Sequence, residues 1–257
     1  ANGNAGPVTL EGMPTTDVAT SVAGPYNNMG VPGAKSFHLN ANGYGAANVY
    51  YERFQTSANA SVIEDAASIG ATFFSLWIGN NDVLSYATSG GSGVDQTGNT
   101  DLSTYGNSDI TDPAVFASVY SQQVSALTAG GAKGALGNIA DVTSASFFTT
   151  VPPQSIPLDA ATAGAVNAQF AAYNTQVLPG LAGLGIITPA EAAARMVTFT
   201  AGVNFPIITD NDLTDITAIL QGPPFSLPAP TAALLGQLRQ VNSNDLILIT
   251  ALSQLGA

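Results

Sequence analysis

The sequence predicts an α/β fold in which helices cover a parallel β-sheet. An apolar run at 72–78 has the length of a buried strand and stops abruptly on the polar stretch 79–82. A second apolar run lies at 134–139, and a helical pattern separates the two. Because parallel neighbours need a long connection, the order strand, loop, helix, strand over 72–141 predicts a right-handed parallel crossover.

The elements before and within this crossover have local signals. The first 50 residues are rich in Gly and Pro and predict loops around one short element. A helical pattern over 57–69 leads into the run at 72–78, which is expected to be a strand buried on both faces, with Trp77 in the core. Ligands of open parallel sheets bind beyond the carboxyl ends of the strands, where we expect a polar loop that holds Asn81 and Asp82.

The segment at 89–112 is polar and has no apolar stripe, so it predicts a long surface loop. Asp112 and Pro113 then form a strong helix start, because the Asp side chain accepts the first free N–H groups and proline lacks one. Gly130 and Gly131 are expected to end this helix before the second strand.

The second half of the chain predicts one long helix and a short one. The long helix begins after Asp159, carries an apolar stripe and is expected to end at Pro179 and Gly180. Thr188 and Glu191 have the spacing of a capping box, in which each side chain accepts the backbone N–H of the other residue.

Strand fragments are expected at 197–200 and 206–208. No internal repeat and no convincing linker interrupts the chain. We therefore expect a single domain over 1–257, with loop-rich insertions at 89–112 and 200–232.

Composition narrows the classes of function. Hydrophobic residues make up 46% of the 257 residues and charged residues only 9%, so the surface must be rich in uncharged polar groups, which favours an exported protein. Five basic residues and a net charge of -12 make nucleic acid an improbable partner. The chain has no cysteine and therefore no disulfide or thiolate nucleophile. No apolar run reaches the roughly 18 residues of a transmembrane segment, and residues 1–7 have no signal-peptide pattern.

Two motifs resemble those of a known enzyme family. Asn28 begins a glycine-rich stretch that reaches Gly33, and the sequence Gly-Asn-Asn-Asp at 79–82 follows the predicted strand. In this order and distance they are similar to the second and third signature blocks of the SGNH, or GDSL-type, esterases and lipases. Over 25–150 the chain looks closest to the larger GDSL-type lipase-like proteins of the Bacteroidetes cell envelope, which carry long insertions.

This resemblance implies the SGNH hydrolase fold, a three-layer α/β/α sandwich with a parallel flavodoxin-like sheet. It implies that Gly33 donates its backbone N–H, and Asn81 its side-chain N–H, to the oxyanion formed during ester hydrolysis, while Asp82 orders the Asn81 loop. Fixed donors of this kind stabilise the charge of the tetrahedral intermediate. The implied substrate is a small-molecule, lipid or glycan ester, with no cofactor and no metal. The implied location is the cell envelope or outside, with envelope proteins as further partners.

The reactive groups of the family are not found in the chain. It has no Gly-Asp-Ser motif, no Asp-x-x-His motif and one histidine, His38. A serine nucleophile needs a base within hydrogen-bond reach. Two explanations stay open: the 257 residues are the central part of a longer hydrolase, or the protein is a degenerate relative that binds or assembles without hydrolysis.

Other polar residues have simpler interpretations. His38 follows Gly33 by five residues and is expected to be a hydrogen-bonded packing residue rather than a catalytic base. Asp210, Asp212 and Asp215 are expected in a loop or a helix cap, as are the acidic residues of 89–112. Calcium binding by these oxygen-rich loops stays open.

Overall fold

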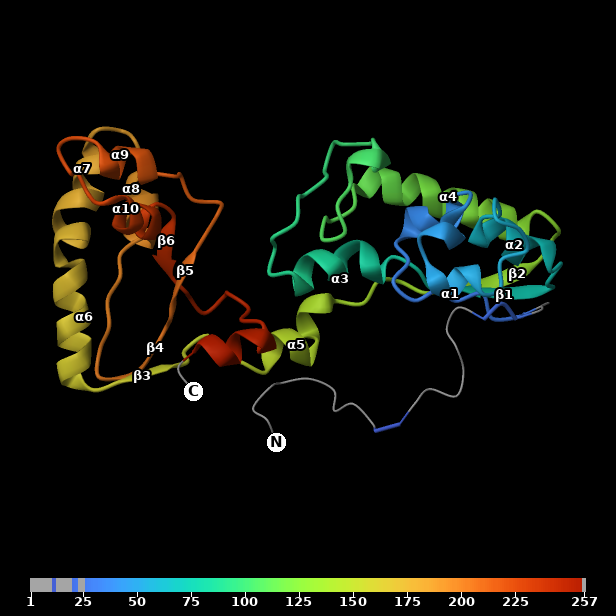
Figure 1. Ribbon diagram of the computed structural model, residues 1–257, viewed down its shortest axis with the longest axis horizontal. Helices are drawn as coiled ribbons and strands as arrows, with labels where there is room; N and C mark the ends of the chain where they lie inside the picture. The colour runs from blue at the N-terminus through green and yellow to red at the C-terminus, as the bar shows by residue number, and fades with distance from the viewer. Residues whose placement is uncertain (1–10, 13–19, 23–25, 256–257) are drawn as a thin grey trace. The chain divides into compact units, whose positions relative to one another are not determined.

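The computed structural model describes residues 11–12, 20–22 and 26–255; residues 1–7, considered above for a signal peptide, lie outside them. The chain divides into two compact units, here called the N-terminal unit, which ends at Ala145, and the C-terminal unit, which begins at Ser146 (Figure 1). The described strands form three two-stranded sheets, of which one is parallel. The described chain therefore mixes helices with small sheets, and its parallel pair is consistent with an α/β fold. None of the described helices has the length and hydropathy needed to cross a membrane.

The N-terminal unit places one parallel sheet against several helices. Its described elements, with 3-10 helices written η, are η1 (Ser36–Asn40), η2 (Tyr44–Ala46), α1 (Val49–Glu52), α2 (Val62–Ser68), β1 (Phe73–Leu76), α3 (Asn80–Thr88), η3 (Leu102–Thr104), α4 (Pro113–Thr128), β2 (Lys133–Leu136) and η4 (Val142–Ser144).

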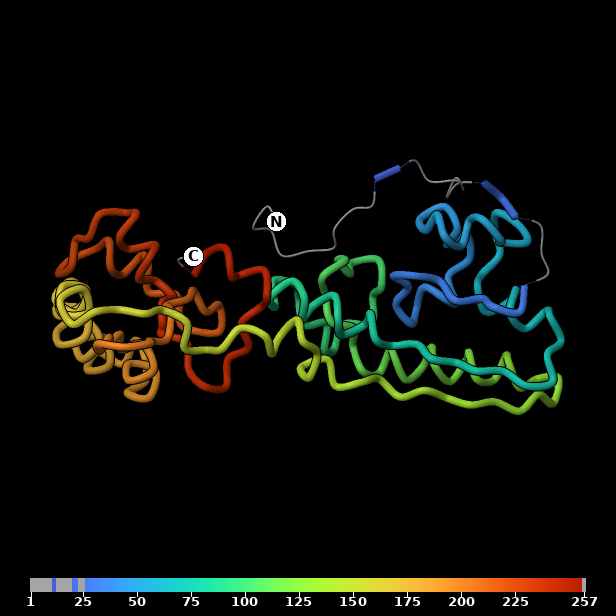
Figure 2. Tube along the Cα trace, turned by 90° about the horizontal axis from the view of Figure 1, so that it is seen from below, coloured from blue at the N-terminus to red at the C-terminus, as the bar shows by residue number. Residues whose placement is uncertain are grey.

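The predicted parallel crossover is confirmed. β1 pairs in parallel with β2, in a register that sets Phe73 opposite Lys133 and Leu76 opposite Leu136. Figure 2 shows the two strands side by side, and α4 connects them. The helix begins as predicted, because Asp112 accepts a hydrogen bond from the Val115 N–H at 2.8 Å and Pro113 occupies the first turn.

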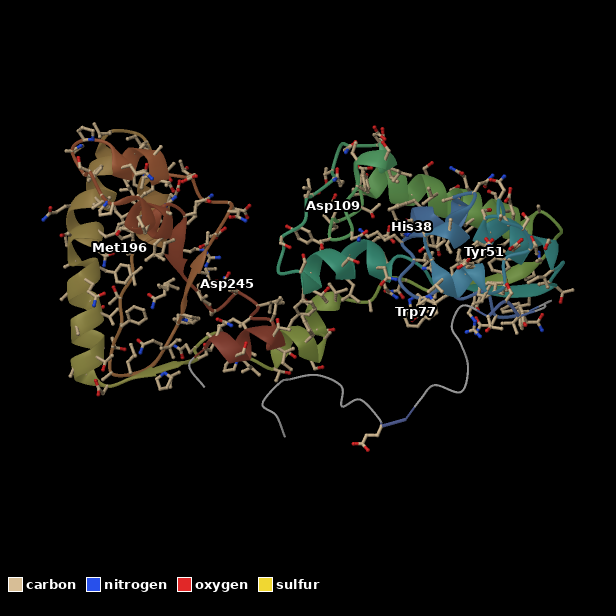
Figure 3. The ribbon with its side chains drawn as sticks, viewed as in Figure 1. His38, Tyr51, Trp77, Asp109, Met196 and Asp245 are labelled. Atoms are coloured by element: carbon tan, nitrogen blue, oxygen red, sulfur yellow. The ribbon has the colours of Figure 1, made fainter. Side chains whose placement is uncertain are left out.

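The prediction that the first strand is buried on both faces is wrong. Leu76 is buried and Phe74 packs with it against the helices of this unit. Phe73 and Trp77, which alternate with them, are 63% and 68% exposed, so Trp77 is not a core residue (Figure 3). Successive strand residues point to opposite faces, and the face that carries Phe73 and Trp77 is the exposed one.

The C-terminal unit packs its helices around two antiparallel two-stranded sheets, β3 with β4 and β5 with β6. Its described elements are α5 (Ser146–Thr149), β3 (Ile156–Leu158), α6 (Ala160–Ala172), a π-helical turn η5 (Tyr173–Val177), α7 (Leu178–Gly183), α8 (Pro189–Ala194), β4 (Gly202–Asn204), β5 (Ile207–Thr209), α9 (Thr217–Gln221), α10 (Ala229–Leu235), β6 (Leu238–Gln240) and the 3-10 helix η6 (Ile249–Gln254).

The predicted end of the long helix is wrong. Pro179 and Gly180 do not end the long helix, because the π-helical turn shifts the hydrogen-bond register and the Leu178 N–H bonds back to the Tyr173 carbonyl. Buried Leu178 and Leu181 then hold the continuing turns of α7 in the core.

The predicted capping box at 188–191 forms only in part. Thr188 accepts from the Glu191 N–H at 3.0 Å. The Glu191 carboxylate instead binds Arg195, which is fully buried, because a buried guanidinium needs a charged partner more than a helix end needs a second cap.

The expected strand at 197–200 is absent, and the described strands of this region are β4 and β5. The segment 200–232, expected to be rich in loops, also contains α9 and most of α10. Leu220 and Ala232 of these helices are completely buried, so the segment contributes to the core of the C-terminal unit.

Candidate functional site

The first candidate residue, Gly33, lies in a tight turn. The Ala34 N–H bonds to the Val31 carbonyl at 3.3 Å, and Gly33 has a positive φ of 77°. Pro32 before it suits the first central position of such a turn, and a positive φ at the second central position favours glycine. The turn exposes Gly33, and no described residue accepts its backbone N–H.

Asn81 and Asp82 lie at the start of α3, directly after β1. The expected polar loop is in fact the first turn of this helix, whose N-cap is Gly79 with a φ of 112°. A Cβ at Gly79 would come within 2.7 Å of Ile139 Cδ1 and 2.8 Å of Phe116 Cε2. Only glycine therefore lets the chain turn this closely from strand to helix.

The side chain of Asn81 joins this helix to the Gly33 turn. Asn81 Nδ2 donates to the Ala34 carbonyl at 2.9 Å, across 47 residues of sequence. The two sequence motifs are thus brought together at the carboxyl end of β1, as their order along the chain predicts. One hydrogen of the Asn81 amide is used in this bond, and a primary amide carries two.

Asp82 is buried and holds the residue that follows the turn. Its Oδ2 accepts the Ser36 N–H at 2.7 Å and its Oδ1 accepts the Ser36 hydroxyl at 2.7 Å. The Thr111 N–H also bonds to the Asp82 carbonyl at 3.2 Å. Asp82 therefore positions the 33–36 segment directly, rather than only ordering the residues around Asn81.

Lys35 ties the same segment to the polar loop at 89–112. It is 4% exposed, and its Nζ donates to the Asp109 carbonyl at 2.7 Å. Burial lowers the pKa of Lys35, while the nearby charges of Asp82 and Asp109 oppose this shift. The loop itself is organised by the Asp109 carboxylate, whose pKa is lowered chiefly by the backbone N–H groups of Val94 and Gly106.

Gln123 on α4 completes the set of contacts and was missed in the sequence. It is completely buried, and its Nε2 donates at 2.8 Å both to the Ser36 carbonyl and to Asn40 Oδ1. The sequence contains one sign of it: Gln123 lies between Tyr120 and Leu127 on the apolar stripe of the helix, where a buried residue is expected.

His38 is a packing residue, as expected. Its Nδ1 accepts the Lys35 N–H at 3.1 Å, and its ring stacks on Tyr44 with centroids 4.7 Å apart. Burial, followed by the charge of Lys35, lowers the pKa of His38. Ser36 is fully buried and gives its hydroxyl to Asp82, so these residues form no serine–histidine dyad.

Two polar hydrogens of this arrangement have no acceptor among the described residues. Gly33 offers a backbone N–H and Asn81 a second amide hydrogen, on two segments fixed to each other. Ser36 donates two hydrogen bonds to Asp82, Gln123 donates one to the Ser36 carbonyl, and Lys35 donates one to the Asp109 carbonyl, so the 33–36 segment is held in place. Donors fixed in advance are what charge stabilisation requires. Within the described residues no serine hydroxyl is hydrogen-bonded to the histidine.

Several of the acidic residues considered for calcium are used by the chain itself. Asp101 and Asp215 accept local N–H groups at the starts of η3 and α9, and Asp210 pairs with Arg239. The described part of the chain contains no cluster of three or more acidic, histidine or cysteine residues that is suited to a metal ion.

Comparison of the chain with protein-family models, with curated proteins and with solved structures finds no match.

Proposed function

We propose that this chain supplies the oxyanion-binding part of a serine ester hydrolase of the GDSL type. The observation that carries the proposal is the hydrogen bond from Asn81 to the Ala34 carbonyl, which sets an amide donor beside the Gly33 turn at the end of β1. The buried contacts of Asp82 and Lys35 support it, because they fix both donors before a substrate arrives.

In this proposal the serine nucleophile and its histidine base come from polypeptide outside the 257 residues. The parallel pair of β1 and β2 would then be part of a larger sheet in an α/β/α sandwich. The substrate is a lipid, small-molecule or glycan ester, and the low proportion of charged residues, 9%, favours action in the cell envelope or outside the cell.

The test is the hydrolysis of p-nitrophenyl butyrate by the protein translated from the reading frame extended on both sides. Asn81→Ala should lower kcat by about 100-fold or more, as loss of one oxyanion donor does. Asn167→Ala is the matched control, because Asn167 Nδ2 also donates to a backbone carbonyl, that of Phe199, at 2.8 Å in the C-terminal unit. An unchanged kcat for a folded Asn81→Ala variant would remove Asn81 from the oxyanion site.

A second candidate is a non-catalytic binding or assembly component of the envelope. The observation that favours it is the state of Ser36 and His38, since the serine is buried and bound to Asp82 and the imidazole is stacked on Tyr44. An extended reading frame that adds no serine and histidine motif, together with no ester hydrolysis, would support this candidate and reject the first.

A further inference from the structure

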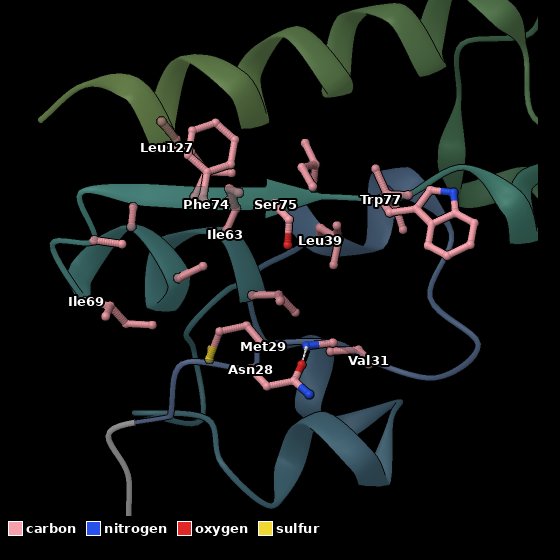
Figure 4. Close-up of a pocket in the computed structure, with 18 of the residues that line it drawn as sticks. Asn28, Met29, Val31, Leu39, Ile63, Ile69, Phe74, Ser75, Trp77 and Leu127 are labelled. Carbon is pink, nitrogen blue, oxygen red and sulfur yellow. Dashed lines mark hydrogen bonds between the residues drawn. The ribbon is translucent and has the colours of Figure 1, made fainter. Parts of the chain in front are cut away.

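A cavity of about 850 Å³ lies beside β1 in the N-terminal unit (Figure 4). Two of its walls are runs of consecutive residues, 27–31 and 73–81. Side chains of a strand alternate between its two faces, so consecutive residues line one cavity where the edge of the strand and its backbone face it. β2 lies along one side of β1 and the 27–31 segment along the other (Figure 2).

The edge of β1 that faces this cavity has hydrogen-bonding groups with no partner in the described part of the chain. The Lys133 N–H bonds to the Thr72 carbonyl and the Gly137 N–H to the Leu76 carbonyl, so the even-numbered residues of β1 face β2. In a parallel ladder the alternate residues point the other way. The backbone N–H and C=O groups of Phe73 and Ser75 therefore point to the open edge, where no described residue pairs with them.

The remaining walls are apolar. Ile63, Ala66 and Ile69 contribute from α2 and its end, and Leu127 contributes from α4. An acyl chain could fill the apolar space. It would also exclude water, however, and so leave the backbone N–H and C=O groups of Phe73 and Ser75 without a hydrogen-bond partner. A peptide strand pairs them and places alternate side chains against the apolar walls.

We propose that the cavity beside β1 binds an extended polypeptide strand, which adds to the open edge of β1. The strand exchanges backbone hydrogen bonds with Phe73 and Ser75 and carries small and apolar side chains. This inference stands on the edge of β1 and on the cavity, so it does not depend on ester hydrolysis.

Trp77 is the natural reporter for the test. It is the only tryptophan of the chain, lines the cavity and is 68% exposed. The 257-residue protein is titrated with capped six-residue peptides of alternating valine and serine, isoleucine and glycine, or leucine and alanine. At least one peptide should shift the Trp77 emission to the blue with saturation, and should slow amide hydrogen exchange at Phe73 and Ser75.

Two comparisons show whether backbone pairing is the cause. Alternate amides of the bound peptide point toward β1. N-methylation of these amides should weaken binding by about tenfold or more, because the peptide then loses hydrogen bonds to β1. Ser75→Pro should abolish binding, since it removes an N–H on the open edge, where proline is tolerated. Ser75→Ala keeps that N–H and should bind as the wild type does.

Several results would overturn the proposal. These are no binding of any of the three peptides, or equal affinity of the methylated and unmethylated forms in both frames. A Trp77 shift with decanoate but not with the peptides would identify an acyl-chain site. Sedimentation that finds a dimer which the peptides do not dissociate would identify a second copy of the chain as the occupant.

Discussion

Replacing Asp82 by alanine should strongly destabilise the N-terminal unit. The carboxylate accepts two hydrogen bonds from Ser36, both at 2.7 Å, and both residues are buried. Each buried donor left without a partner costs about 1–3 kcal/mol, so the two together should lower the free energy of unfolding by about 2–6 kcal/mol. The free energy of unfolding of a typical domain is about 5–15 kcal/mol, so this loss is a large share of it.

The assay is urea unfolding followed by the fluorescence of Trp77, which reports on the N-terminal unit because it is the only tryptophan and lies in that unit. The midpoint should fall while the slope of the free energy against urea stays constant, since the surface exposed on unfolding is nearly the same. The rate of hydrogen exchange at the Ser36 amide should rise by the factor that corresponds to the same loss of free energy.

Asp101→Ala is the matched control. Asp101 also accepts the N–H and the hydroxyl of one serine, Ser103, at 3.0 and 2.6 Å, but both residues are exposed. Water replaces these bonds, so the loss should be about 1 kcal/mol or less. Equal losses for the Asp82 and Asp101 variants would refute the argument that burial makes the Ser36 contact important.

Three further predictions concern other parts of the chain. In an NMR titration, His38 should have a pKa below its usual value of 6.5. The unfolded chain then takes up the proton at a higher pH than the folded chain, so the contribution of His38 to stability should be complete above pH 6.5 and be lost as the pH falls below it. A midpoint above 6.5 would contradict the burial of the ring. Gly79→Ala should cost about 2 kcal/mol or more in the same urea assay, from its positive φ and from close contacts, whereas Gly130→Ala, with nothing within 4 Å, should be nearly neutral. Arg195→Met should cost the C-terminal unit about 3–5 kcal/mol, because it leaves a carboxylate without its buried partner; calorimetry should show this while the Trp77 transition stays unchanged.

Signals that act within a few residues could be predicted from the sequence. Asp112 with Pro113, and Asp159, begin helices in the structure as expected, because a cap is satisfied by N–H groups two or three residues away. The turn at Gly33 likewise follows from the Pro32 and Gly33 pair.

Features that depend on what lies across the fold could not be predicted in this way. Trp77 is in an apolar run, but only the packing decides which face of a strand is covered, and its face is open. Pro179 has the sequence pattern of a helix end, yet a π-helical turn and the burial of Leu178 carry the helix past it.

For the candidate site, the sequence by itself determined the residue types and their order: a glycine turn at Gly33, then an apolar strand, then Asn81 and Asp82. Only the tertiary structure decided that Asn81 meets the Gly33 turn and that Asp82 holds Ser36. The physical reason is that these bonds join groups 46 and 47 residues apart, and their geometry is set by the packing of β1 and α3 against the 33–36 segment.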